Sequence, residues 1–427
     1  MFHVENAKVR ALLLKGNFGL EKESLRVTTE GHMAHTPNPF PDNEHIVRDF
    51  CENQTEINTP VLSSAQEAVD SLWEYTRQIH TALAALPERE LLWPFSNPPF
   101  IHNEADIPVA RFEGGKAGKT TYREYLSDRY GRYKMTLSGI HINFSFAEAL
   151  LREDFALSGE KDFQEYKNQL YVTLAERTAA YGWIMTALTA ASPLMDSSFV
   201  EKGHYGVDEF NGMASTRCSE LGYWNYFSPF FDYSSVRAYA DSIQKYVDDG
   251  LLAAPTELYY PIRLKPKGKN DLSRLRNEGV DHIELRMVDL NPLEPAGLDL
   301  KDLQFAQLLL VWLASTPRQP FTLKDQVQAV QNFKNAAHYD LKTVKIVAPD
   351  GEVYSVADAG HKVISFMREF YAGFPKEVQD ILNFEAEKFT DPEKRYAWRI
   401  RREFANGFVR KGLALAEARQ REAVSHV

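Results

Sequence analysis

Three short segments of the chain alternate polar and apolar residues with a period of two. They run from Phe18 to Val27 (FGLEKESLRV), from Ile140 to Phe146 (IHINFSF) and from His282 to Val288 (HIELRMV). Successive side chains of a β-strand point to opposite sides, so the polar residues of each segment are expected to share one face. We therefore predict three amphipathic strands, with a polar face that carries Glu21, Glu23, His141, Glu284 and Arg286.

The rest of the pattern predicts further strands and many helices. Apolar residues recur at helical spacing through residues 161–191, and the last helix is predicted to begin with Asp391 as its N-cap and Pro392 at its first position. From Leu300 onward we expect mostly helix, interrupted by a hairpin with Pro349-Asp350-Gly351 as its turn. The other expected elements are helices at about 4–15 and 63–86 and strands at about 17–28, 45–59, 256–264 and 281–289.

The order of these elements indicates the fold class. Strands and helices do not alternate as in βαβ units, and the strands are amphipathic, which favours an antiparallel sheet with one open face in an α+β protein. The chain contains no repeat, no low-complexity segment and no Pro/Ser-rich linker. We therefore expect one domain over residues 1–427, with a core that bears the sheet at about 15–300 and a mostly helical part at about 300–427.

Composition and charge exclude several classes of protein. Hydrophobic residues make up 44% of the 427 residues and charged residues 25%, as in soluble globular proteins, and the net charge of −10 without a basic run argues against nucleic-acid binding. The apolar run from Leu308 to Ala314 is too short to span a bilayer, and residues 1–14 lack the features of a signal peptide. Cys51 and Cys218 are far apart in the sequence, so we expect free thiols and a cytoplasmic location.

One glycine-rich segment resembles a phosphate-binding loop but departs from its pattern. Residues 113–120 read EGGKAGKT, and the phosphate loop G-x-x-x-x-G-K-[ST] requires glycine where this chain has Glu113. A carboxylate at that position would repel the phosphate. We therefore expect a mobile surface loop here and not a P-loop enzyme.

Acidic residues are also frequent between Asp49 and Glu56. These two residues differ in strand parity, so both can face Glu21 and Glu23 only if a turn or bulge separates them. Two like charges ~4 Å apart repel by ~4 kcal/mol at an effective dielectric constant near 20. A cluster of carboxylates therefore favours bound divalent cations, and Mg²⁺ commonly bridges carboxylates to substrate phosphates. On the same basis, Glu284→Gln is expected to relieve repulsion and to cost the fold little.

The pattern alone leaves two interpretations open. Polar residues that alternate along a strand often form a solvated face, and a single residue such as His141 is often a structural histidine. The other interpretation is a site for metal and phosphate, with Arg286 as the contact for a phosphoryl oxygen or a substrate carboxylate.

At these same residues the sequence resembles bacterial glutamate–cysteine ligase, the first enzyme of glutathione biosynthesis. The resemblance covers residues 15–300, about two thirds of the chain, with its blocks in the order of the family. The matching blocks are Gly19 to Val27 (GLEKESLRV), Asp49-Phe50 with Glu56 to Pro60 (EINTP), Tyr122-Arg123-Glu124 with Arg129-Tyr130-Gly131, Ser138 to Ser145 (SGIHINFS), Ser219 to Tyr223 (SELGY), Leu258 to Arg263 (LYYPIR), and Ile283 to Arg286 (IELR) with Asp289 to Pro292 (DLNP).

The resemblance implies a fold and a reaction. The fold is a curved, mainly antiparallel sheet of the glutamine synthetase and guanido kinase type, with a concave active-site face and flanking helices. ATP phosphorylates the γ-carboxylate of L-glutamate, and the amine of L-cysteine attacks the acyl phosphate, giving γ-glutamylcysteine, ADP and phosphate. Phosphoryl transfer requires positioning and neutralisation of charge more than a protein nucleophile, which fits a site of acids and metal ions.

The resemblance also assigns roles to individual residues. It implies two or three Mg²⁺ ions, replaceable by Mn²⁺, bound by Glu21, Glu23, Asp49, Glu56, His141 and Glu284. Arg286 would contact the transferring phosphate beside Glu284, with Lys265 and Arg263 as further phosphate contacts, and Arg217 would bind the backbone carboxylate of glutamate. The pocket for the cysteine side chain would be formed by Tyr122, Leu126, Tyr223, Tyr259 and Phe50.

The expected partners are therefore small molecules, namely L-glutamate, L-cysteine and ATP, with no nucleic acid and no membrane, in a monomer or weak homodimer. Some relatives carry an appended ATP-grasp region, and since this chain ends near residue 427 we expect it to catalyse one ligation only. Three other functions stay open: a ligase of the same superfamily with another acceptor amine, a glycoside hydrolase that uses a carboxylate pair without ATP, and an inactive relative that binds or regulates.

Overall fold

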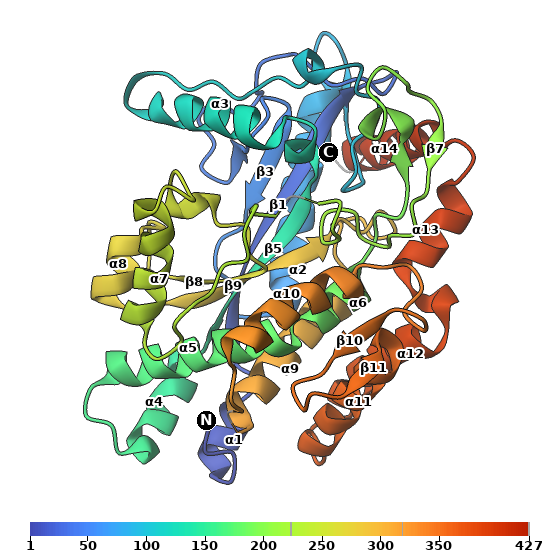
Figure 1. The fold of residues 1–427 in the computed structure, drawn as a ribbon. Helices are drawn as coiled ribbons and strands as arrows, with labels where there is room; N and C mark the ends of the chain where they lie inside the picture. Colours follow the sequence, from blue (N-terminus) through green and yellow to red (C-terminus); the bar gives the residue numbers. More distant parts are fainter. Residues whose placement is uncertain (223, 318, 426–427) are drawn as a thin grey trace.

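The computed structural model describes residues 1–222, 224–317 and 319–425 and contains a seven-stranded sheet at its centre (Figure 1). The strand order is β2-β3-β1-β5-β9-β8, with β4 also paired to β1, and every pairing is antiparallel. This confirms the prediction of an α+β fold with an antiparallel sheet. The strands are β1 (Gly16–Thr28), β2 (Ile46–Arg48), β3 (Gln54–Asn58), β4 (Glu90–Leu92), β5 (Gly139–Phe146), β8 (Ile262–Lys265) and β9 (His282–Asp289).

The register of the sheet aligns the polar residues of neighbouring strands. Glu21 of β1 lies opposite His141 of β5, and Glu23 of β1 lies opposite Glu56 of β3. Glu284 of β9 lies opposite Asn143 of β5. The register between β5 and β9 shifts between Ile140 and Ile142, which is the mark of a β-bulge. Because of this bulge, the strict alternation of β9 ends near Arg286.

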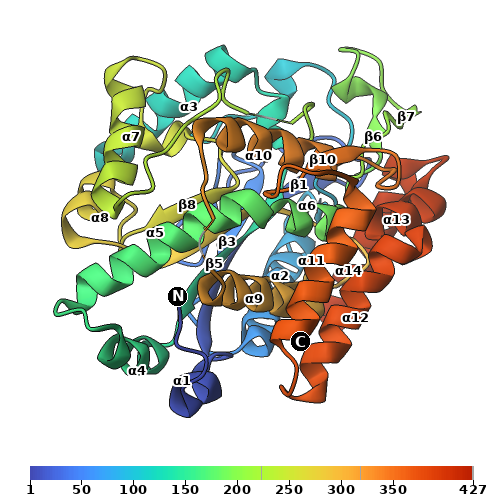
Figure 2. The same ribbon diagram turned by 60° about the horizontal axis from the view of Figure 1, so that its bottom comes forward.

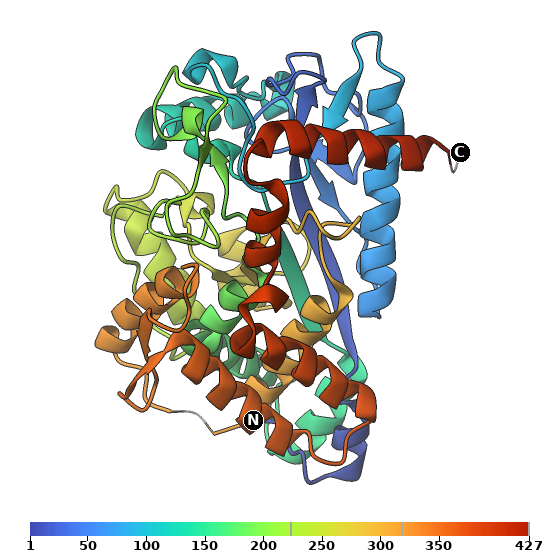
Figure 3. The same ribbon diagram turned by 90° about the vertical axis from the view of Figure 1, so that its right-hand side faces the viewer.

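One side of the sheet is covered by helices that bury its apolar residues. The core includes Phe18 and Leu20 of β1 and Ile142 and Phe144 of β5. Against them pack α2 (Ala65–Ala84), α5 (Phe163–Tyr181), α6 (Trp183–Thr189) and α9 (Leu300–Ser315). Figure 2 shows α9 between α5 and α12 (Lys376–Thr390), and Figure 3 shows α2 in light blue along one side of the sheet.

The long strand β1 changes its buried face halfway along. The odd positions carry Glu21 and Glu23 in the middle of the strand but Leu25 and Val27 at its end, where they join a second apolar cluster. Arg26, on the opposite face, is fully buried and forms an ion pair of 2.8 Å with Glu90. The expectation that residues 18–27 have one polar and one apolar face is therefore right only for the first half of the segment.

Several expected boundaries differ in the structure. Residues 161–191 form two helices, α5 and α6, which Gly182 separates, and residues 45–59 form β2 and β3 with a turn between them. Asp391 caps a single 3₁₀ turn, so the prediction of the last helix was wrong. The two helices beyond that turn are α13 (Tyr396–Phe404) and α14 (Phe408–Ser425), and between them Asn406 and Gly407 adopt positive φ angles of 60° and 122°.

The glycine-rich segment at 113–120 is also more regular than expected. Gly114–Lys116 form a 3₁₀ turn, and Gly118 begins helix α3 (Gly118–Tyr130), so the segment is not a loop throughout. The remaining elements are α1 (Ala7–Leu12), α4 (Glu148–Ser158), α7 (Val236–Asp248), α8 (Leu272–Glu278), α10 (Leu323–Ala336), α11 (Val356–Phe370), and the hairpins β6–β7 (Met195–Asp196, Asp208–Glu209) and β10–β11 (Lys345–Val347, Val353–Ser355). The last hairpin contains the expected turn at Gly351.

Two predictions from composition concern the whole chain. Cys51 and Cys218 are both buried and free, as expected. Among the described helices, none combines the length and the apolar character that a membrane span requires.

Candidate active site

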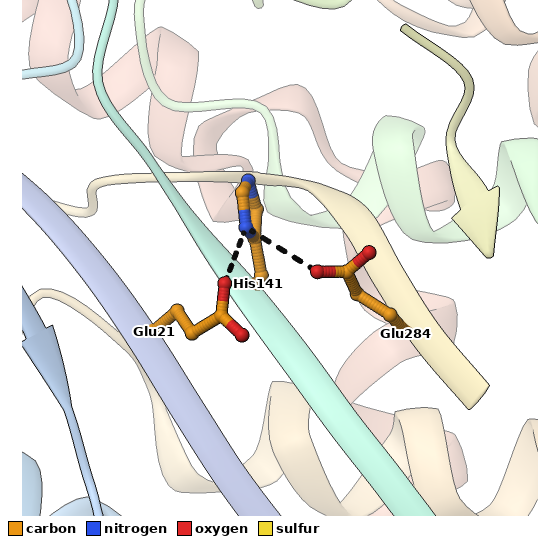
Figure 4. Close-up of side chains that lie close together, drawn as sticks. All are labelled: Glu21, His141 and Glu284. Atoms are coloured by element: carbon orange, nitrogen blue, oxygen red, sulfur yellow. Dashed lines mark hydrogen bonds and ion pairs between the residues drawn. The ribbon is translucent and has the colours of Figure 1, made fainter. Parts of the chain in front are cut away.

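Three side chains from neighbouring strands point toward one another on the polar face of the sheet (Figure 4). His141 Nδ1 lies 3.0 Å from Glu21 Oε2 and 3.8 Å from Glu284 Oε1. Each of the three residues contributes one potential ligand atom, and these three atoms all lie within 4.8 Å of one another. Segments 120 residues or more apart in the sequence thus form one compact group of donors.

The atoms of this group fit a divalent cation. In the part of the chain that the structure describes, Glu284 Oε2 and His141 Nε2 are buried and have no hydrogen-bond partner. Buried polar atoms are nearly always paired in folded proteins, so these two are available to a ligand. Carboxylate oxygens suit Mg²⁺ and Mn²⁺, and the imidazole adds a nitrogen donor that Mn²⁺ accepts.

Cationic side chains surround Glu284, whose side chain is 0% exposed. Its Oε1 lies 3.0 Å from Lys265 Nζ and 3.2 Å from a terminal nitrogen of Arg286, and Arg263 is its register partner on β8. Burial alone would raise the pKa of Glu284, but the neighbouring cations, led by Lys265 and Arg286, hold that pKa well below its usual range. The Glu284 carboxyl is therefore ionised at neutral pH.

The carboxyls on the other side of the site behave differently. Burial and the charge of Asp49 raise the pKa of Glu23 well above its usual range and raise the pKa of Glu56 to about 8. Glu23 accepts a hydrogen bond of 3.0 Å from the amide of Gly139, and its Oε1 is 3.8 Å from His141 Nε2. Among the described residues, the compact donor group contains neither Glu23, Asp49 nor Glu56, so these three form an outer acidic set.

Arg217 is held against the start of β5. Its guanidinium donates to the carbonyls of Arg286 and Val288 at 3.0 and 3.1 Å. A Cβ atom on Gly139 would come within 2.3 Å of that guanidinium, so the position of Arg217 depends on the glycine. Arg217 and Arg286 line one pocket together with Tyr259.

Aromatic and aliphatic side chains form one apolar cluster, and Tyr259, which packs against it, also lines the pocket of Arg217 and Arg286. Phe50 and Leu126 are buried in this cluster, and Tyr122 and Tyr259 pack against it half-buried. The ring of Tyr259 meets that of Tyr130 edge-on at 5.3 Å. The predicted pocket residues thus lie in one cluster, except for Tyr223, which falls outside the described residues.

The structure adds two residues to which no role was assigned from the sequence. Asn143 donates to Glu21 at 2.9 Å, and its place on the polar face of β5 was the signal that could have found it. Glu257 is fully buried and accepts hydrogen bonds from Tyr130 at 2.7 Å and from the amide of Ala253 at 2.6 Å. Its partner Tyr130 lies on α3, 127 residues away in sequence, so no local pattern points to Glu257.

Known proteins resemble this chain in sequence. The family model described as glutamate-cysteine ligase matches residues 1–336. The glutathione biosynthesis bifunctional protein GshAB of Listeria monocytogenes is 35% identical over 422 residues, which cover 95% of this chain and 54% of the relative. The glutamate–cysteine ligase of Clostridium acetobutylicum is 35% identical over 353 residues, which cover 71% of this chain and 72% of the relative. The chain thus spans about half the length of the bifunctional relatives it matches.

Solved structures resemble it in fold. The bifunctional glutathione synthetase of Pasteurella multocida superposes with a TM-score of 0.83 at 28% identity, over 98% of this chain and 54% of that chain. The glutamate–cysteine ligase of Francisella tularensis, crystallised with AMP, superposes with a TM-score of 0.86 at 24% identity, over 96% of this chain and 89% of that chain. The extent of the sequence matches identifies the chain as a member of the glutamate–cysteine ligase family.

Proposed function

We propose that the protein is an ATP-dependent glutamate–cysteine ligase that forms γ-glutamylcysteine, the first intermediate of glutathione biosynthesis. The observation that carries this proposal is the convergence of Glu21, His141 and Glu284 beside the cationic side chains of Arg286 and Lys265. A carboxylate is a poor electrophile, so the reaction needs a phosphorylated intermediate. A site of acids and cations, in a chain of this family, suits that phosphorylation.

The compact donor group would hold divalent metal, with Mg²⁺ as the expected ion. Glu21, His141 and Glu284 supply the first ligands, and the outer acidic set of Glu23, Asp49 and Glu56 supplies ligands for one or two more ions. When bound, these ions neutralise the negative charge of the nucleotide phosphates. Arg286 and Lys265 lie beside Glu284, where their charges can stabilise the oxygens of the transferred phosphoryl group.

The two steps of the reaction require no protein nucleophile. An oxygen of the glutamate γ-carboxylate attacks the γ-phosphorus of ATP, and ADP leaves. The cysteine amine then attacks the acyl carbon, loses a proton, and phosphate leaves. Burial raises the pKa of the Cys218 thiol to about 11, so the thiol stays protonated at neutral pH and is a poor nucleophile. This agrees with a mechanism based on positioning and electrostatics.

The substrates would bind at opposite ends of the pocket that Arg217, Arg286 and Tyr259 line. Arg217 is the contact for the backbone carboxylate of glutamate, since its guanidinium is fixed by the carbonyls of β9. The apolar cluster around Phe50, Leu126 and Tyr259 would receive the cysteine side chain, because thiols pack favourably against aromatic rings.

The test is ADP formation by the purified protein with ATP, Mg²⁺ and L-glutamate. We expect L-cysteine to accelerate ADP release more than L-serine or L-alanine, with γ-glutamylcysteine detected by mass spectrometry. EDTA should abolish the activity. Equal rates with all three amines would reassign the protein to a ligase with another acceptor, and full activity in EDTA or without ATP would overturn the proposal altogether.

A further inference from the structure

A second polar pocket lies behind the candidate active site, on the opposite face of β1. Its basic side chains come from three elements, namely Lys22 of β1, His80 of α2 and Arg419 of α14. The hydroxyl of Thr76 on α2 and the side chain of Trp93 complete the wall beside them. None of the residues that line this pocket carries a carboxylate.

The ammonium group of Lys22 is buried without a counter-charge. The residue is 5% exposed and donates a hydrogen bond of 3.1 Å to the hydroxyl of Thr76. Over the described residues, no carboxylate lies within ion-pair distance of this ammonium group. Buried charges in proteins are normally paired, because removal from water is costly. Burial, together with the charge of Arg419, accordingly lowers the pKa of Lys22 to about 7, and the protonated form lacks a counter-charge among the described residues.

His80 gives an independent indication of a ligand. The residue is 2% exposed, and its Nδ1 has no hydrogen-bond partner within the described part of the chain. Burial, together with the charges of Lys22 and Arg419, lowers the pKa of His80 to about 3, so the ring is neutral and carries one N–H. A neutral imidazole in the pocket can donate this N–H to an anion without adding to the positive charge.

Arg419 completes the positive side of the pocket. Its guanidinium donates to the carbonyls of Pro292 and Glu294 at 2.5 and 2.8 Å, which fixes it in place. The acidic side chains whose charges interact with the Arg419 guanidinium are Glu294 and Glu422, and neither of them lines the pocket. Lys22 and Arg419 thus make this pocket positively charged, and no Asp or Glu side chain lines it.

The size of the space limits the ligand. The free volume of the pocket is about 10 Å³, which admits one water-sized particle. Phosphate or a carboxylate substrate does not fit there. A water molecule would leave the protonated form of Lys22 uncompensated, whereas a small anion would stabilise that form. We propose that Lys22, His80 and Arg419 bind one small monovalent anion of the halide class, such as chloride, which joins β1, α2 and α14.

The direct test uses bromide as a heavier halide. Crystals of the unmutated protein in sodium bromide should show an anomalous peak between Lys22, His80 and Arg419. A crystal with ordered side chains at these positions and no anomalous peak would overturn the proposal. This measurement does not depend on any variant folding correctly.

A stability measurement tests the same site in solution. Replacing sodium gluconate by sodium chloride at constant ionic strength should raise the Tm by about 1–2 °C for each tenfold increase in chloride above its dissociation constant. Lys22→Met should lose this response. Lys15→Met, which removes the exposed lysine just before the same strand, should keep it. The same chloride response in Lys22→Met as in the unmutated protein would contradict the proposed site.

Discussion

The surroundings of Glu284 reverse a prediction based on the acidic residues alone. Carboxylate repulsion led us to expect that Glu284→Gln costs the fold little. In the structure, Lys265 and Arg286 contact this carboxylate, and its charge compensates theirs. We now predict that Glu284→Gln lowers the free energy of unfolding by about 2–4 kcal/mol, because it removes the charge that compensates the buried ammonium group of Lys265. Urea unfolding at pH 7 in EDTA measures this change.

The matched control for this prediction is Glu278→Gln. Glu278 also forms an ion pair, with Arg274 at 2.8 Å, but its side chain is 55% exposed. Exposed pairs contribute little, so we expect this variant to unfold at nearly the same urea concentration as the unmutated protein. If the two variants unfolded at the same urea concentration, the charge of Glu284 would not support its cationic neighbours.

Replacing Glu56 by glutamine should raise the free energy of unfolding, whereas the same replacement at Glu284 should lower it. The pKa of Glu56 is raised to about 8 by burial and by Asp49, so the folded protein holds a proton that the unfolded chain releases above its ordinary pKa near 4.5. Its contribution therefore turns unfavourable as pH rises from about 4.5 to 8. We predict that Glu56→Gln stabilises the metal-free protein by about 1 kcal/mol at pH 8 and by almost nothing at pH 4.5.

Thermal unfolding of both proteins at a series of pH values, in EDTA, gives this difference. The comparison cancels the titrating groups that do not interact with Glu56, and the difference reports Glu56 together with Glu23, whose pKa Glu56 also raises. Glu52→Gln is a suitable control, since Glu52 is held by Arg48 at 2.7 Å and lies outside the acidic set. A gain from Glu56→Gln that is constant over the whole pH range would contradict the raised pKa.

At the scale of elements, the sequence predicts where strands lie in the chain better than it predicts which elements pack against them. A period of two was sufficient to find β1, β5 and β9, because it follows from strand geometry alone. The change of buried face within β1 could not be found in this way, since it depends on which helices cover each end. Asp391 shows the same limit: its side chain caps a turn as predicted, but that turn lasts only three residues.

The start of β5 is the element on which the position of Arg217 depends. Gly139 leaves room for the guanidinium, and a Cβ atom there would have to displace it. If Arg217 binds the glutamate carboxylate, we predict that Gly139→Ala raises the KM for glutamate about tenfold, equivalent to ~1.4 kcal/mol, and changes the KM for ATP much less. Steady-state kinetics with each substrate varied in turn measures both constants.

Gly115→Ala is the control for the loss of a glycine, because nothing lies within 4 Å of a Cβ atom at that position. The Gly115→Ala variant should have KM values for glutamate and for ATP within a factor of two of those of the unmutated protein. Equal increases in the two KM values for Gly139→Ala would indicate a general distortion of the sheet, and would argue against a specific role of Arg217.

At the scale of the whole molecule, the site depends on register between distant segments. The sequence identified the types of residue, because an acid or histidine opposite large apolar residues is visible locally. It could not pair Glu21 with His141 or place Lys265 against Glu284, since these contacts depend on which strands are neighbours. The network of Glu257 with Tyr130 was likewise invisible, because its members meet only when α3 packs against the turn at 255–257 before β8.

The proposed metal centre links the stability of the whole molecule to pH. A ligand that binds only the folded state adds about 2.7 kcal/mol at a hundredfold excess over its dissociation constant, which is about 3 °C in Tm for a chain of this length. We predict that Mg²⁺ raises the Tm by about this amount at pH 8 and that EDTA reverses the rise. The rise should be smaller at pH 6, where Glu23 and Glu56, with their raised pKa values, must release protons before they accept a cation. Magnesium is added as its gluconate, and sodium gluconate at matched ionic strength is the control for screening, because chloride is itself proposed to raise the Tm. Glu284→Gln should lose most of the Mg²⁺ response at both pH values, and a response equal to that of the unmutated protein would remove Glu284 from the metal site.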